Sequence, residues 1–293
     1  MKTSNLSKKY ARWGWVFVSP AAILIFALSF YPMIQAFILS LQSGMGNNLR
    51  FSGLRNYFRL FQDEVFRSSV ANVFTYLVIQ VPIMLFLALV LSSVLNMKNL
   101  KGRSVFRTMV VLPCAMALVS SALIFRSFFS LDGIVNLTLL KMNIIRTPLS
   151  FLTDPFWAKF VIILIITWRW TGYNTIFYLA GLQNIDDSIY EEARIDGASS
   201  VQQFFLITLP LLRPVILLTV IMSTNGTLQL FDEVKIISPE GLKSTISISQ
   251  YIYNLFFQMT PQLGYASAVS YSILIMVAIL AFIQTKIGDE KDV

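Results

Sequence analysis

The chain contains no histidine, and its single cysteine is Cys114. One cysteine cannot form a disulfide within the chain, and the usual nitrogen and sulfur ligands of a transition metal are almost missing. We therefore expect no metal site. The sequence also lacks a glycine-rich phosphate-binding loop and any cluster of a nucleophile with a base, so we expect no cofactor in this chain and no enzymatic activity.

Charged residues are scarce as well. Only 13% of the 293 residues are charged and 56% are hydrophobic, whereas roughly 25% of residues are charged in soluble domains. Long uncharged runs, such as the one between Arg12 and Arg50, can hold the roughly 20 apolar residues that cross a bilayer. Because these runs are continuous rather than alternating, they favour membrane-spanning helices over a β-barrel.

The sequence predicts an all-α membrane protein with one transmembrane domain over residues 1–293. The fourth predicted span is interrupted only by Lys159 near its start and Arg169 near its middle. Prolines within the first three spans, at positions 20, 32, 82 and 113, favour kinks. The six predicted spans cover about residues 15–40, 69–95, 106–127, 157–182, 206–228 and 264–285.

Basic residues predict the orientation in the membrane. A group of lysines and arginines precedes the first span, and another fills the loop between the second and third spans, in both cases without an acid. These groups are Lys2, Lys8, Lys9 and Arg12, and Lys98, Lys101, Arg103 and Arg107. They place both termini in the cytoplasm, although arginines in the first outer loop weaken the pattern. The net charge of +8 then reflects basic residues that anchor the chain at the surface of the lipid bilayer, and we expect no nucleic-acid partner.

A hydrophilic island over residues 190–214 separates the fourth and fifth spans. Ser188 followed by Glu191 predicts a capping box, with a helix that begins near Ile189. Gly197 suits the left-handed residue that ends such a helix. Ser199 or Ser200, with a glutamine three positions later, predicts the start of a second helix. The island is therefore predicted to form a helix–turn–helix elbow over residues 186–210 that is held at both ends by spans.

The elbow resembles the Glu-Ala-Ala loop of binding-protein-dependent ABC importer permeases. The matching residues are Glu191-Glu192-Ala193, Gly197, Ile207 and Leu209-Pro210, in the spacing of that pattern. Glu192 departs from it, because the pattern has alanine there. The flanking segments 180–185 and 194–198 resemble the carbohydrate branch of the maltose and glycerol-phosphate type, in which a proline is usual where Asp186 stands.

The resemblance implies a type I ABC importer permease that forms the translocation path for a sugar or oligosaccharide. The elbow would dock on a separate ATPase subunit through Glu191, Glu192, Ala193, Asp196, Gly197, Ile207, Leu209 and Pro210. The implied partners are two such subunits, which bind ATP-Mg, an extracellular solute-binding protein and a second permease. We expect that second permease to differ from this chain and form a heterodimer with it. The implied location is the inner membrane of a bacterial or archaeal cell.

Polar and aromatic residues within the spans are candidates for the substrate pathway. Polar groups at this depth are expensive, so they face either a wet cavity or another helix with which they form hydrogen bonds. The candidates are Asn72 in the second span, Trp170, Asn174 and Tyr178 in the fourth, and Asn225 and Gln229 in the fifth. Arg169 could pair with the partner permease, extend to the membrane surface or line the pathway.

Two alternative functions remain open at this level. A permease for an amino acid, a polyamine or glycerol phosphate would share the elbow but usually differs in the flanking residues. A secondary carrier is disfavoured because no acid stands out within the spans and no internal repeat is visible.

Overall fold

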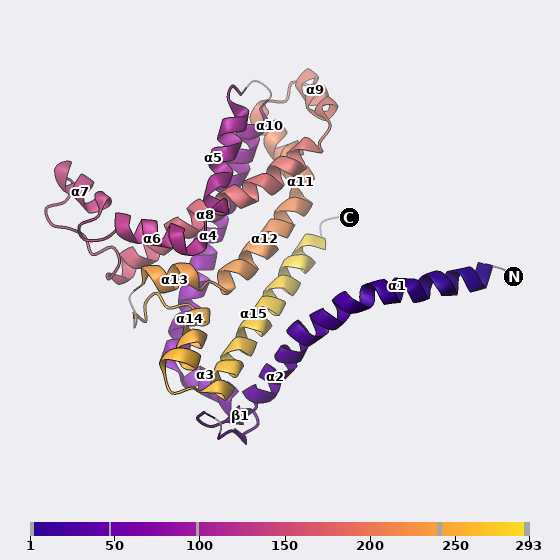
Figure 1. Cartoon of the computed structure of the whole chain (residues 1–293). Helices are drawn as coiled ribbons and strands as arrows, with labels where there is room; N and C mark the ends of the chain where they lie inside the picture. Colours follow the sequence, from indigo (N-terminus) through magenta and orange to yellow (C-terminus); the bar gives the residue numbers. More distant parts are fainter. Residues whose placement is uncertain (1–2, 47, 98–99, 239–241, 290–293) are drawn as a thin grey trace. The chain divides into compact units, whose positions relative to one another are not determined.

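The computed structural model describes residues 3–46, 48–97, 100–238 and 242–289 (Figure 1). Apart from one short pair of strands, the regular structure of these residues is helical. The chain divides into two compact units, Met1–Gln62 with Ile252–Ser272 and Asp63–Tyr251 with Ile273–Val293. Helices α14 (Ile248–Tyr253) and α15 (Leu263–Asp289) cross this division.

The first unit begins with one long helical segment. Helix α1 (Thr3–Ile25) continues through the π-helical turn η1 (Phe26–Phe30) into α2 (Tyr31–Ser40). Its apolar part, Trp13–Ser40, is long enough to cross a membrane and coincides with the first predicted span. Pro20 lies inside α1, and Pro32 lies in the first turn of α2, directly after the π-helical turn.

Hydrogen bonds join the short elements that follow α2 in this unit. Strands β1 (Gln42–Ser43) and β2 (Arg50–Phe51) pair in an antiparallel ladder. The buried Asn56 of α3 (Arg55–Gln62) donates to the carbonyls of Ser40 at 2.8 Å and Gln42 at 2.7 Å. Arg59 donates to Gln262 at 2.8 Å and lies over a tyrosine ring of α15. These contacts hold α3 against the residues that follow α2 and against the segment at the start of α15.

The second unit is built around three helices, α4 (Glu64–Asn96), α8 (Pro155–Gln183) and α12 (Arg213–Leu228), which pack against one another. The carboxylates of Asp63 and Asp154 accept the first backbone N–H groups of α4 and α8, so both helix starts are capped. The end of α15 joins this group through a hydrogen bond from Gln284 to Thr224 of 2.8 Å. Pro82 does not interrupt α4.

Two of the predicted spans are bent sharply. Helices α5 (Arg103–Ala115) and α6 (Leu118–Phe128) meet at 95°, and the segments Ser200–Leu211 and Arg213–Leu228 meet at 67°. The described residues therefore contain four candidate membrane spans, or up to six if each bent pair counts as one. The predicted span over 106–127 is broken into two helices, because the backbone of Met116 and Ala117 is extended, whereas we had expected a kink at Pro113.

A buried core holds the connecting helices of this unit against α4 and α8. These helices are α6, α7 (Ile134–Lys141) and α13 (Asp232–Ile237). The hydroxyl of the buried Tyr76 in α4 donates to the carbonyl of Thr245 at 2.8 Å. The segment after the fifth predicted span contains α14, and its Ile248 is completely buried. Ten buried residues form the centre: Tyr76, Phe129, Phe151, Val161, Ile162, Ile165, Ile166, Leu230, Val234 and Ile237.

Gly172 allows α5 and α8 to approach closely. A Cβ atom at this position would lie 1.9 Å from the carbonyl oxygen of Val110. We predict that Gly172→Ala forces the helices apart and lowers the free energy of unfolding by about 1–3 kcal/mol, the usual cost of overpacking. Thermal unfolding of the purified protein measures this. The control is Gly226→Ala in α12, where a Cβ atom would meet no other atom within 4 Å; an equal effect of the two substitutions would contradict the prediction.

Candidate functional site: an elbow and a cavity on the same helices

The elbow begins with α9 (Asp187–Ile195). Its cap is Asp186, whose carboxylate accepts the backbone N–H of Ser188 at 3.0 Å. This hydrogen bond lowers the pKa of the Asp186 carboxyl. The predicted start near Ile189, with Ser188 as the cap, is wrong because the acid two positions earlier provides the accepting oxygen. Asp186 occupies the position at which the resembling permeases usually have proline.

Gly197 makes the bend of the elbow. Its φ of +85° is the left-handed conformation that the sequence predicts. The turn is closed by hydrogen bonds from the N–H of Gly197 to the carbonyl of Arg194, 3.1 Å, and from the N–H of Ala198 to the carbonyl of Ala193, 2.8 Å. These bonds satisfy carbonyls at the end of α9, as at many glycine-terminated helices.

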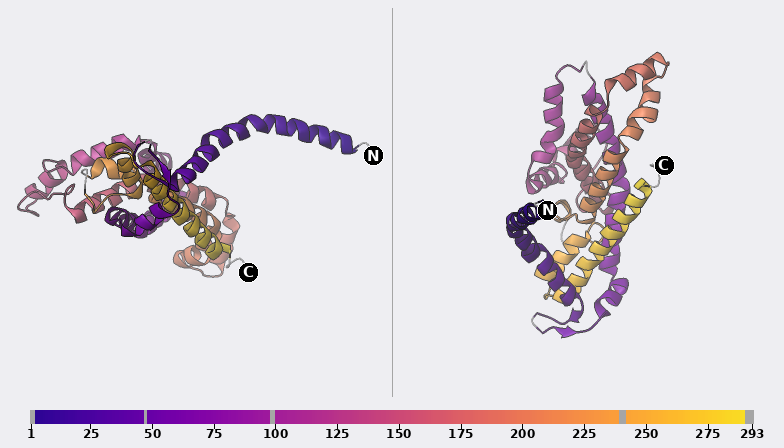
Figure 2. Two further views of the ribbon diagram at one scale, coloured as in Figure 1. Left: turned by 90° about the horizontal axis from the view of Figure 1, so that it is seen from below. Right: turned by 90° about the vertical axis from the view of Figure 1, so that its right-hand side faces the viewer.

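The second arm starts with a capping box in which Ser199 and Gln202 each accept a backbone N–H of the other, as predicted. Helix α10 (Ser200–Gln203) continues through the π-helical turn η2 (Phe204–Thr208) into α11 (Leu209–Leu211). The hydroxyls of Tyr190 and Thr208, 3.0 Å apart, tie the first arm to the second. The elbow is therefore one internally bonded body at the end of α8 and α12, at the opposite end from α13 (Figures 1 and 2).

The predicted coupling residues gather on this body. Glu191, Glu192 and Asp196 are exposed on α9 and its C-terminus, and Ala193 is half-buried. Ile207 lies in η2, and Leu209 and Pro210 form the start of α11. We had not predicted the exposed apolar side chains of the elbow, which include Ile195 (85% exposed) and Leu206 (73%). Exposed apolar groups beside acids are typical of a surface that binds another protein.

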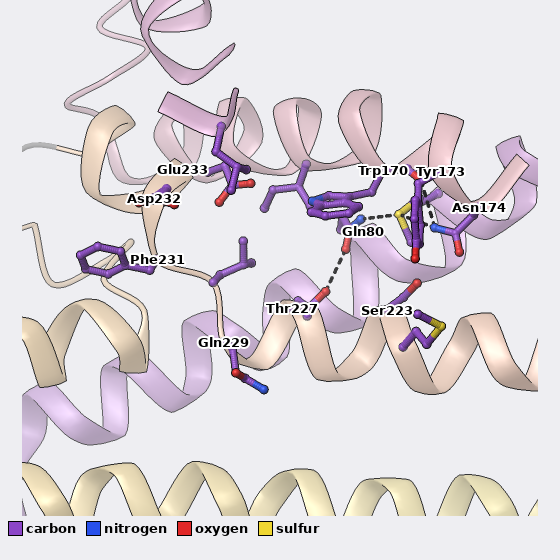
Figure 3. Close-up of a pocket in the computed structure, with 16 residues that line it drawn as sticks. Gln80, Trp170, Tyr173, Asn174, Ser223, Thr227, Gln229, Phe231, Asp232 and Glu233 are labelled. Carbon is purple, nitrogen blue, oxygen red and sulfur yellow. Dashed lines mark hydrogen bonds between the residues drawn. The ribbon is translucent and has the colours of Figure 1, made fainter. Parts of the chain in front are cut away.

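A cavity of about 380 Å³ lies among α4, α6, α8, α12 and the segment that leads into α13 (Figure 3). Three of the predicted pathway residues line it: Trp170, Asn174 and Gln229. Asn225 is outside the lining and accepts a hydrogen bond from Gln229. The two others lie elsewhere, because their polar atoms hold the fold together. Asn72 donates to the carbonyls of Lys243 and Ile246, and Tyr178 is hydrogen-bonded to Thr219.

Hydrogen bonds hold the polar side chains of the cavity in place. The hydroxyl of Thr227 in α12 donates to Gln80 of α4 at 3.2 Å, and Gln80 donates to the sulfur of Met84 at 3.0 Å. Asn174 donates to the carbonyl of Trp170 at 3.0 Å. The Trp170 ring stands among these groups, with the side chain of Tyr173 beyond it (Figure 3). The cavity thus combines aromatic rings with fixed amide and hydroxyl groups.

Two acids also line the cavity, Asp232 and Glu233 at the start of α13. Glu233 is only 4% exposed. Burial raises the pKa of the Glu233 carboxyl, while the positive charge of Arg169 acts in the opposite direction. We had not predicted these acids as site residues, although they stand directly after an uncharged run.

Arg169 connects the two halves of the broken span. This side chain is 6% exposed, and it donates to the carbonyls of Pro113 at 3.3 Å and Cys114 at 3.4 Å, at the end of α5. It also donates to the hydroxyl of Ser121 in α6 at 3.1 Å. The carbonyls at a helix end lack partners within the helix and carry partial negative charge, so a guanidinium suits this position. Arg169 therefore does not extend to a surface.

We predict that Arg169→Gln lowers the free energy of unfolding by about 1.5–3 kcal/mol, because a buried charged donor to α5 and α6 is lost. Ser121→Ala should cost less, since it removes one acceptor. The double variant should lose less than the sum of the two, because both substitutions break the same hydrogen bond. Thermal unfolding of the purified variants measures this coupling. Additive effects would show that the Arg169–Ser121 hydrogen bond contributes nothing.

Comparison with known proteins agrees with this geometry. Residues 96–289 match the family model described as "Binding-protein-dependent transport system inner membrane component". The chain is 52% identical over 292 residues to the lactose transport system permease protein LacF of Rhizobium radiobacter, with 98% of each chain covered. It is 30% identical to the trehalose/maltose transport system permease protein MalF of Thermococcus litoralis, covering 98% of this chain and 97% of that one.

The fold also matches a solved structure. A chain in the crystal structure of a bacterial ABC transporter involved in the import of the acidic polysaccharide alginate superimposes with a TM-score of 0.85. The two sequences are 25% identical, and the match covers 99% of this chain and 100% of that chain. The chain therefore belongs to the binding-protein-dependent inner membrane components of ABC transporters, and it is a multi-pass transport permease rather than an enzyme.

Proposed function

We propose that this chain is the permease subunit of an ABC importer for a sugar or oligosaccharide. One observation carries the proposal: the elbow is bonded into a single body and continues directly into α8 and α12, and these two helices carry Trp170, Asn174 and Thr227 of the cavity. A displacement of the elbow is therefore delivered to the walls of the cavity. ATP hydrolysis in another subunit could drive transport in this way.

The proposed assembly contains two permeases, two ATPase subunits that bind ATP-Mg, and an extracellular solute-binding protein. This chain acts as one permease domain with six spans, without a cofactor of its own. Its elbow and both termini face the cytoplasm. The second permease is a different chain, which makes the pair a heterodimer. The family description supports the binding protein as a partner.

The cavity chemistry supports a saccharide as the solute. Sugars present hydroxyl groups to amides and hydroxyls, and present apolar ring faces to aromatic side chains. The cavity provides both, with the amides of Gln80 and Asn174 beside the rings of Trp170 and Tyr173. The two rings meet edge to face, with centroids 5.7 Å apart. Related permeases are described as transporting lactose and trehalose or maltose, which supports the same class.

We predict that Gly197→Val reduces co-purification of the ATPase subunits and uptake, because a branched side chain at a φ of +85° strains the bend by about 1–3 kcal/mol. The matched control is Gly197→Asn, since asparagine tolerates the left-handed conformation and should retain most of both activities. Pull-down from membranes and uptake by cells measure the effect. Normal co-purification of the valine variant would contradict a docking role for the bend.

We predict that Trp170→Ala lowers uptake roughly tenfold, because an aromatic face is lost from the cavity. The ATPase subunits should remain bound, since the elbow is unchanged. Tyr178→Phe is the control on the same helix: its hydroxyl bonds Thr219 outside the cavity lining, so uptake should change little. Equal losses of uptake in the two variants would indicate that Trp170 acts only through the packing of α8.

A further inference from the structure

We infer that this cavity accepts uncharged saccharides and disfavours anionic ones such as uronates, through the negative charge of Asp232 and Glu233. The inference rests on the proposed function and gives the substrate class of the same site. Two carboxylates line a space that is otherwise bounded by apolar, aromatic, amide and hydroxyl groups. Among the described residues that line it, none is a lysine or an arginine.

Arg169 is the cation whose charge acts on Glu233, and its hydrogen bonds go to residues outside the cavity lining. Its terminal nitrogens donate to the carbonyls of Pro113 and Cys114 and to Ser121 at the α5–α6 break. Arg169 is not part of the lining, although its charge partly offsets that of Glu233. Asp232 is half-buried and adds a second negative charge. The two acids therefore stand in a lining that contains no basic residue among those described.

A solute carboxylate in this space meets charge of its own sign in a partly desolvated site. Charges that are a few ångströms apart near a protein surface change binding by roughly tenfold or more. A neutral sugar avoids this repulsion, and its hydroxyl groups can donate to carboxylate oxygens. The charge-assisted hydrogen bonds that result are stronger than neutral ones. The same acids thus favour neutral sugars and oppose anionic ones.

Glu233 also stands beside the ring that we assign to sugar stacking. Both residues line the cavity, and Figure 3 shows their side chains in the upper part of the view, below the ribbon of α8. An acceptor next to an aromatic face can bind the hydroxyls at the rim of a sugar whose apolar face lies on the ring. In this proposal the Trp170 ring stacks on the sugar, and the Glu233 carboxylate disfavours a solute with negative charge.

The test uses thiol reagents of opposite charge on the assembled complex, in a Cys114→Ser background. Ser223→Cys places a thiol in the lining of the cavity, and Met222→Cys provides a second reporter if the first variant does not fold. We measure the labelling rates with a cationic trimethylammonium methanethiosulfonate and an anionic sulfonate methanethiosulfonate. The ratio of the two rates, divided by the same ratio for 2-mercaptoethanol in solution, reports the local charge independently of transport.

We expect this normalised ratio to be roughly tenfold above one, and to fall several-fold in Asp232→Asn and in Glu233→Gln. Asp132→Asn is the matched control, because this exposed acid lies outside the lining and its removal should leave the ratio unchanged. A ratio near one, or a ratio that neither substitution changes, overturns the inference.

Uptake assays distinguish this outcome from failure of the proposed function. Vesicles with the complete complex and its binding protein are supplied with lactose, and separately with its anionic oxidation product lactobionate. Uptake of lactose well above lactobionate supports the inference, and a smaller preference in Asp232→Asn strengthens it. Efficient uptake of lactobionate overturns it. A high labelling ratio without saccharide uptake would instead leave the charge of the cavity established and remove the proposed saccharide function.

Discussion

The second unit depends on the hydrogen bonds that Arg169 donates at the end of α5, inside an apolar bundle. Helix α5 stops at Ala115, so its last carbonyls need donors that lipid and apolar side chains cannot supply. Arg169 of α8 supplies them and also bonds α6, across the 95° bend. Burying a guanidinium is costly unless its hydrogen bonds are made; both terminal nitrogens of Arg169 make them here, whereas its buried Nε has no partner among the described residues. The break and the arginine therefore stabilise each other.

This arrangement also determines what surrounds the cavity. The bend turns α6 away from α5 and brings Leu118, the first residue of α6, to the cavity wall. Arg169 is hydrogen-bonded to the two helices at the break. Its neighbour Trp170 and, one turn further on, Asn174 line the cavity. Glu233 then lies near the arginine without entering the hydrogen bonds at the break. The cavity with its acidic and aromatic lining thus lies beside the helix end that Arg169 stabilises.

The elbow, in contrast, is held in shape mainly by contacts between residues that are close in the sequence. Its shape comes from short-range contacts: the Asp186 cap, the Gly197 turn and the Ser199 capping box all join residues within a few positions of each other. The contact of Tyr190 with Thr208 closes a longer loop. Such a body keeps its form when it is pushed. It is therefore suited to pass a displacement to α8 and α12, whose inner faces line the cavity.

The sequence alone determined the features that depend on local pattern. Uncharged runs predicted the helical membrane class, and caps and glycine predicted the elbow, although Asp186 rather than Ser188 begins it. Tertiary structure decided which polar residues share a space. Trp170, Asn174 and Gln229 line the cavity, whereas Tyr178 has the same helical spacing but bonds Thr219, and Asn72 bonds backbone carbonyls. The partners of Arg169 were equally hidden, because they lie more than 45 positions away in the sequence. Helical spacing shows which residues share a face, but only packing shows what that face meets.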